Sequence, residues 1–366
     1  MNTRKFAVLP GLLFVMLQFL FVNSYAQGPF KDFERMEGTR YVHPVIDRSD
    51  SLSAREIVEL RDSEGIPVWF GRDIFKNVCL TGECRMVRLR IYWNGAANYL
   101  GIKINENEPL TKTDHSVFSQ EDYQKLDRIL ADSLSMLKRL VMKDLTVERK
   151  NESKYRVDGI TGATQPTIFE SVVRNAVYTT YTLWHTVYGP TRDLIRSILD
   201  EPANKEYLQR LFARQNPLYL IWTIDYIARH PQYHSIFYPE IIKCIKSNDY
   251  ELFQKSVGYF TPASLTNESV QNDLAMVAGE PSVLNRYEIL RKFSALPHIS
   301  DDAILIFLEH YEKQKISAGL LGYVLDLVRT ENLKNDLIGK KLKKLSRDKN
   351  LYVRNLAKEK LSGAKI

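Results

Sequence analysis

Residues 87–95 read VRLRIYWNG, and this stretch decides the fold of the first half of the chain. Apolar side chains at 87, 89, 91 and 93 alternate with Arg88, Arg90 and Tyr92, which is the period of a strand with one buried face. Asn94-Gly95 is a strong turn signal, and a second alternating run follows at residues 99–104. Strands with one buried and one solvated face predict an antiparallel sheet.

The segments on either side of these strands extend the same domain. Residues 66–104 as a whole are strand-like, whereas residues 27–65 are polar with few hydrophobic periods and are interpreted as an irregular arm. Downstream, Ser119 to Asp122 resembles a capping box that opens a helix. A second short helix is expected from Ser135 to about Leu145, and residues 146–156 are expected to be strand or loop.

A wide apolar face predicts one long buried helix from Thr167 to Tyr188. Thr167 would cap it, and Glu170 would bond back to the cap. Gly189-Pro190 would end this helix and mark a boundary. The sequence therefore predicts an α+β domain over residues 66–188.

Residues 190–366 have a different character, because alternation and glycine-rich turns disappear. Helical periodicity is present in residues 218–228, 236–245, 283–293, 302–311, 320–328 and 337–345. Residues 351–357 (LYVRNLA) resemble the start of the second helix of a HEAT-like repeat. An all-α, HEAT-like array of helical hairpins is expected, with an irregular all-α domain as the alternative.

The N-terminus has the pattern of an export signal. Arg4 and Lys5 precede an apolar run from Leu9 to Val22, and Ser24-Tyr25-Ala26 is a small-x-small cleavage site. Residues 1–26 are therefore predicted to be a signal peptide, and the mature chain to be a soluble protein of the periplasm or another extracytoplasmic compartment. Removing Arg4 and Lys5 lowers the formal net charge from +7 to +5, which is weak support for a polyanionic partner, and export argues against nucleic acid.

The chain contains three cysteines, at positions 79, 84 and 244. In an oxidising compartment Cys79 and Cys84 are candidates for a local disulfide across a turn at Thr81-Gly82. Zinc would need further ligands nearby, and the spacing is not that of a C-x-x-C redox motif. No metal site is predicted.

Residues 157–167, VDGITGATQPT, are the main candidate for a functional site. If Thr167 caps the following helix, the hydroxyl of Thr164 stays available on a small-residue loop beside a helix N-terminus. Such a terminus presents unpaired amides and favours negative charge. The loop therefore predicts a phosphate-bearing group near Thr164, while a plain turn remains the alternative reading of its glycines.

Asp158-Gly-Ile-Thr161-Gly162-Ala163-Thr164 resembles the D-x-x-[ST]-G-A-T motif of FMN-binding domains, with confident similarity over about residues 155–185. These domains occur in the sodium-pumping NADH:quinone reductase, in the Rnf complex and in other exported bacterial flavoproteins. The resemblance implies that Thr164 carries FMN through a phosphoester bond, which a separate flavin transferase makes. It also implies an electron-transfer protein that works with a membrane or exported redox partner.

No residue stands out as a catalytic acid, base or nucleophile, so an electron carrier is favoured over a self-contained enzyme. The alternative is a cofactor-free adaptor that binds proteins through its helical array. His115, His185 and a row of aromatic residues over 178–188 are weaker cofactor candidates. The plainer interpretations are a turn residue for His115, a hydrogen-bonded helix residue for His185 and core packing for the aromatic row. His230 and His234 have metal-like spacing interrupted by Pro231. The basic run from Lys340 to Lys349 could contact acidic lipid or a partner, with a solvated helix face as the default.

Overall fold

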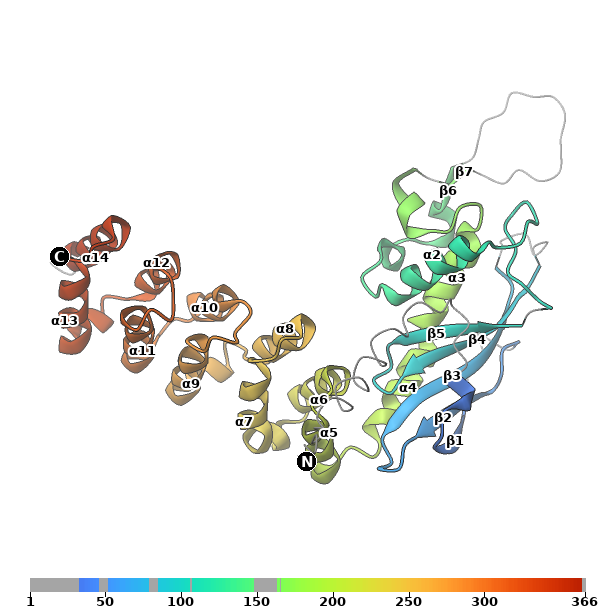
Figure 1. Ribbon diagram of the computed structural model, residues 1–366, viewed down its shortest axis with the longest axis horizontal. Coiled ribbons are helices and arrows are strands. Elements are labelled where there is room, and N and C mark those ends of the chain that lie inside the picture. Colours follow the sequence, from blue (N-terminus) through green and yellow to red (C-terminus); the bar gives the residue numbers. More distant parts are fainter. Residues whose placement is uncertain are drawn as a thin grey trace, which may run out of the picture. The chain divides into compact units, whose positions relative to one another are not determined.

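The computed structural model describes residues 33–45, 52–78, 85–105, 107–147, 163–164 and 166–363. The chain divides into two compact units, Met1–Glu201 and Pro202–Ile366 (Figure 1). The first unit combines a sheet with helices, and the second is helical in its described part. The predicted order of an α+β region followed by an all-α region is confirmed.

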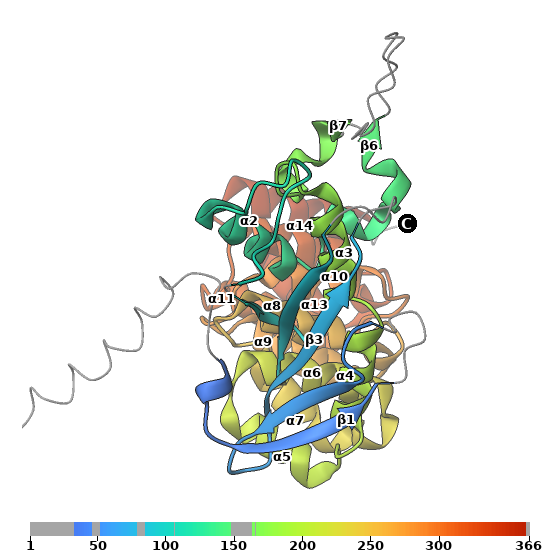
Figure 2. The same cartoon turned by 90° about the vertical axis from the view of Figure 1, so that its right-hand side faces the viewer.

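The first unit contains a five-stranded antiparallel sheet in which strand order follows chain order (Figure 2). Its strands are β1 Thr39–Pro44, β2 Glu56–Arg61, β3 Pro67–Lys76, β4 Val87–Asn94 and β5 Tyr99–Ile104. The predicted strands at 87–93 and 99–104 are therefore confirmed. Ala97 adopts a left-handed backbone with φ of 60° in the turn that joins them. The expectation that Tyr92 lies on a solvated face is wrong, because its side chain is buried in a cluster with Trp69 and Leu60.

The prediction that residues 27–65 form an irregular arm is wrong for the two segments that form β1 and β2. Strand β1 lies at the edge of the sheet and is almost wholly exposed, so it carries no apolar alternation. Strand β2 buries Ile57 and Leu60, but a register shift beside Leu60 interrupts its pattern. Both strands are defined by backbone hydrogen bonds, and these leave no side-chain pattern in the sequence.

The sheet is fixed to the end of one helix and the start of the next, α3 Val177–Val187 and α4 Pro190–Asp200. The buried indole Nε1 of Trp93 donates to the carbonyl of Val187 at 2.9 Å. The buried guanidinium of Arg72 donates to Oγ1 of Thr191 at 2.6 Å. Both bonds join residues about a hundred positions apart, and they bring α4 into the first unit.

Helix α2, Gln120–Ala131, begins as predicted. Ser119 accepts from the amide of Asp122, and Asp122 accepts from the amide of Ser119, which completes the capping box. The short helix expected from Ser135 to Leu145 is instead two 3-10 helices, η4 Met136–Arg139 and η5 Met142–Asp144. Side chains from α3 bind the carbonyls of this segment, and those contacts replace the bonds of a regular α-helix.

The long helix predicted over 167–188 is also wrong in its first part. A 3-10 helix, η6 Pro166–Ser171, comes first, and α3 begins only at Val177. Asn175 has a left-handed backbone with φ of 57°, and its carbonyl accepts both the amide and the hydroxyl of Thr113. The amide of Val173 is taken by the Thr180 hydroxyl. These tertiary bonds stabilise a break that the apolar periodicity does not show.

The second unit consists of helical hairpins stacked in two rows (Figure 1). One row contains α5 Lys205–Arg214, α7 His234–Cys244, α9 Glu268–Ala278, α11 Asp301–Glu312 and α13 Asp336–Leu345. The other contains α6 Pro217–Arg229, α8 Tyr250–Tyr259, α10 Arg286–Ser294, α12 Ala318–Leu327 and α14 Leu351–Gly363. The six periodic segments and the helix after residue 350 are all present. Helices α4, α5, α8 and α9 were not predicted.

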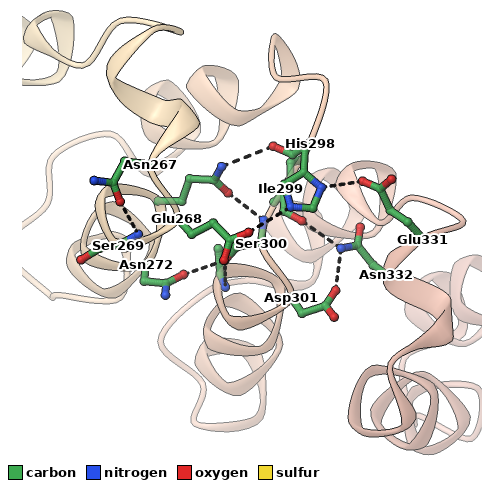
Figure 3. Close-up of polar contacts among 12 residues, drawn as sticks. Asn267, Glu268, Ser269, Asn272, His298, Ile299, Ser300, Asp301, Glu331 and Asn332 are labelled. Atoms are coloured by element: carbon green, nitrogen blue, oxygen red, sulfur yellow. Dashed lines mark hydrogen bonds and ion pairs between the residues drawn. The ribbon is translucent and has the colours of Figure 1, made fainter.

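Buried polar side chains connect successive hairpins of this unit (Figure 3). The amide of Asn332 donates to the carbonyl of Ile299 at 2.9 Å and to Asp301 at 2.7 Å. One hairpin earlier, Gln271 accepts from the amide of Ser300 at 2.8 Å. Because both side chains are fully buried, each bond satisfies a polar group that would otherwise be costly to desolvate.

Candidate functional site

The predicted flavin loop lies only partly within the described structure. Asp158, Thr161 and Gly162 fall outside the described residues. Ala163–Thr164 form the short strand β7, which pairs antiparallel with β6, Thr146–Val147. Thr164 is paired with Thr146 in this ladder, so its backbone is positioned by a strand from the segment just after η5.

The backbone after Thr164 differs from the expected helix end. The expectation that Thr167 caps a long α-helix is wrong, because residues 166–171 form one short 3-10 helix. Six residues of 3-10 geometry do not supply the aligned dipole of a long α-helix, so η6 does not attract an anion to Thr164 as a long helix would. The ammonium of Lys125 donates to the carbonyl of Phe169 at 2.8 Å and fixes this turn to α2.

The aromatic row on α3 has a structural role. Four of its polar side chains bind backbone carbonyls of residues 130–140. Tyr188 binds Leu130, Trp184 binds Asp132, His185 binds Leu137 and Tyr181 binds Leu140, at distances from 2.8 to 3.1 Å. Burial lowers the pKa of His185, so the ring is neutral near pH 7, with Nε2 carrying the proton that the carbonyl accepts. The plainer reading of these residues, core packing, agrees with this geometry.

A small pocket does bring together two of the weaker candidates, His115 and Tyr178. Its volume is about 60 Å³, roughly room for a few water molecules. The end of β3, the start of β4, the turn over 108–115 and the first turn of α3 form its wall. The turn at Thr113-Asp114-His115 is confirmed: Asp114 accepts from the amide and hydroxyl of Ser116, and His115 has φ of 62°.

Charged side chains line part of this pocket. Arg85, Arg88 and Lys112 line it together with His115 and the carboxylate of Glu108, and the Lys112 ammonium is paired with Asp122 at 2.6 Å. Arg88 lies 3.2 Å from one oxygen of Glu108, and the other oxygen of Glu108 is buried with no hydrogen-bond partner in the described part of the chain.

The sequence did not single out Arg85, Lys112 or Thr179 for this pocket. They meet because the turn over 108–115 folds onto the segment before α3, through the two bonds from Thr113 to the carbonyl of Asn175. These contacts span about sixty residues and leave no local pattern. The nearest signal was the turn residue His115 itself.

The other candidate residues do not form a site. Cys79 and Cys84 lie outside the described residues, so their disulfide stays a prediction. Cys244 is buried and free, and burial raises the pKa of its thiol to about 11, which makes it unreactive.

His230 and His234 each bond a backbone carbonyl of α6, on either side of the break at Pro231. Within the described ranges, no group of three His, Cys, Asp or Glu side chains is arranged to hold a metal ion. Nor does any helix there have the length and apolarity needed to cross a bilayer.

Comparisons with protein-family models, with curated proteins and with solved structures found no match to this chain.

Proposed function

We propose that this chain is an exported flavoprotein that transfers electrons through FMN bound at or near Thr164. The observation that carries the proposal is the run Asp158-Gly-Ile-Thr161-Gly162-Ala163-Thr164, which matches every fixed position of the D-x-x-[ST]-G-A-T motif. In that family the last threonine is the attachment residue, and the first unit here has the α+β composition that such a domain requires.

Thr164 supplies the hydroxyl that a covalently held phosphate group needs. A threonine hydroxyl can form a phosphoester once an external transferase activates it, because on its own it is a weak nucleophile. The pairing of Thr164 with Thr146 would hold the attachment point in an extended backbone. FMN would supply the redox chemistry, while the protein would bind and orient it.

An electron carrier fits better than a complete enzyme. The aromatic and histidine side chains of α3 are engaged in structural bonds, and the motif provides no proton-transferring group of its own beyond Asp158. The redox partner would be a membrane or exported protein, and a flavin transferase would be needed for maturation.

Co-expression with a flavin transferase tests this proposal. The mature chain should show flavin fluorescence on a denaturing gel, and Thr164→Ala should abolish it. Thr167→Ala is the matched control, because it removes a neighbouring hydroxyl outside the D-x-x-[ST]-G-A-T run. A wild-type band without fluorescence, together with a native protein that holds no flavin, would contradict the proposal.

A second function is favoured by the second unit. We propose, as the alternative, a cofactor-free adaptor that uses the stacked hairpins α5–α14 as a HEAT-like binding surface. The supporting observation is the two-row stack, whose extended surfaces suit protein partners. The adaptor is favoured if no flavin is found and cross-links from a stoichiometric partner fall on α5–α14, while Thr164→Ala leaves that partner bound.

A further inference from the structure

We propose that the last hairpin, α13–α14, binds the surface of an anionic lipid bilayer. Residues 336–363 carry most of the positive charge surplus of the chain. Their cations are Lys340, Lys341, Lys343, Lys344, Arg347, Lys349, Arg354, Lys358 and Lys360, against Asp336, Asp348 and Glu359. The proposal does not depend on flavin or on Thr164.

Part of this charge is neutralised within the array. Lys341 and Lys344 both bind the carboxylate of Glu312 on α11, at 2.7 and 3.0 Å. Arg354 donates to the carbonyl of Asp348 at 3.1 Å. These three side chains therefore already have partners on the protein.

Other cations of this hairpin have no ion pair within the described residues. Arg347 lies in the turn just after α13, which ends at Leu345, and Lys340 and Lys343 are three residues apart on one face of the helix. That face is opposite Ile338, Leu342 and Leu345, which are buried against the array. All three cations are exposed and form no ion pair within the described residues. Lys349 and Lys358 are likewise exposed without an ion pair there.

Exposed leucines accompany these cations. Leu351 at the start of α14 is 60% exposed, and Leu337 in α13 is 56% exposed. Cations and exposed leucines on one hairpin are the composition of a segment that lies in a bilayer interface, with leucine in the acyl boundary and lysine at the headgroups.

The leucines also decide between two kinds of partner. A soluble polyanion would be attracted by the cations alone, and its binding would be insensitive to Leu337 and Leu351. Binding to an anionic bilayer would be strengthened by both the cations and the leucines. Each basic residue near the surface adds electrostatic attraction, and each leucine buries apolar area in the lipid. The combination therefore points to lipid.

Vesicle co-sedimentation tests the proposal, using the chain from Gln27 onward and vesicles of phosphatidylcholine with about one third phosphatidylglycerol. We expect binding at low salt, weak binding to pure phosphatidylcholine, and loss of binding at high ionic strength. The triple variant Lys340→Gln, Lys343→Gln, Arg347→Gln should bind at least about tenfold more weakly. The double variant Leu337→Ser, Leu351→Ser should also bind more weakly.

A matched control variant distinguishes the effect of the charges on α13–α14 from the effect of lowering the net charge of the chain. Lys205, Lys246 and Lys315 are exposed cations on other hairpins, with no ion pair in the described structure, and their triple change to Gln removes the same charge. It should bind within about twofold of the wild type. The proposal is overturned if the two triple variants bind alike, or if wild type does not bind the anionic vesicles. Unchanged binding of the leucine variant, with full competition by polyglutamate, would identify a soluble polyanion partner instead and would equally overturn it.

Discussion

Arg72 in strand β3 and Thr191 in helix α4 are joined by a buried hydrogen bond of 2.6 Å, across 119 positions of sequence. Arg72 is 1% exposed, and its Nε also donates to the carbonyl of Ala54 at 3.0 Å. Helix α4 therefore belongs to the same unit as the sheet. The sequence had instead suggested a domain boundary at Gly189-Pro190.

Removing the Thr191 hydroxyl should destabilise the first unit. Thr191→Val keeps the side-chain volume but removes the buried hydrogen bond from the Arg72 guanidinium to Oγ1 of Thr191, at a cost of about 1–3 kcal/mol. Urea unfolding should show a lower midpoint. Thr182→Val is the control, because the buried Thr182 hydroxyl has no hydrogen-bond partner in the described structure. It should leave the midpoint unchanged or raise it. Equal effects of the two substitutions on the unfolding midpoint would contradict a stabilising role for the hydrogen bond between Arg72 and Thr191.

Asn332 should couple the last two hairpins of the array. Its amide binds Ile299 and Asp301, and its oxygen accepts from the amide of Arg329 at 3.0 Å. Asn332→Leu would leave these groups unpaired and should weaken local stability by at least about 2 kcal/mol. Hydrogen exchange should accelerate in α13 and α14 before the earlier hairpins. The exposed Asn355→Ala should exchange like the wild type, and an unchanged pattern in Asn332→Leu would count against the coupling.

His298 should make the array slightly more stable at mildly acidic pH. Its ring lies 2.8 Å from Glu331 and 3.2 Å from Glu268 (Figure 3), and these hydrogen bonds, Glu331 first, raise its pKa above the ordinary value. A pKa raised on folding gives stability that is fully present below the unfolded-state pKa and is lost as pH rises through the folded-state pKa. All three side chains are at least half exposed, so the contribution should stay below about 1 kcal/mol.

The measurement for His298 is the difference in melting temperature between the wild type and His298→Gln. It should be larger at pH 5.5 than at pH 8. A difference that is the same at both values, or larger at pH 8, would show that the two carboxylates do not stabilise the protonated ring.

Local patterns were enough for part of this fold. The alternation that begins at Val87 and the capping box at Ser119 both depend on residues close in sequence. The structure has the strand and the capping box, although the alternation of burial ends at Tyr92, which is buried like its neighbours. The edge strand β1 was missed because its side chains are exposed and only its backbone is paired. The start of α3 was misplaced because Thr113 and Thr180, neither of them adjacent in sequence, bind the backbone at Asn175 and Val173.

At the candidate site, too, local features could be predicted from the sequence and tertiary ones could not. The motif at Thr164 can be read from consecutive residues, whereas the small pocket depends on a turn and a helix about sixty residues apart. The helix end expected beside Thr164 was wrong for a tertiary reason, so the proposed flavin site now depends on the motif and not on a helix dipole.

Peptide mass spectrometry tests the central claim most directly. After co-expression with a flavin transferase, trypsin should release residues 157–174, which contain Thr161, Thr164 and Thr167. We predict that this peptide carries one FMN phosphoester and that fragmentation places it on Thr164. An unmodified peptide recovered in full from protein matured in this way, or a flavin placed on Thr161 or Thr167, would contradict the account.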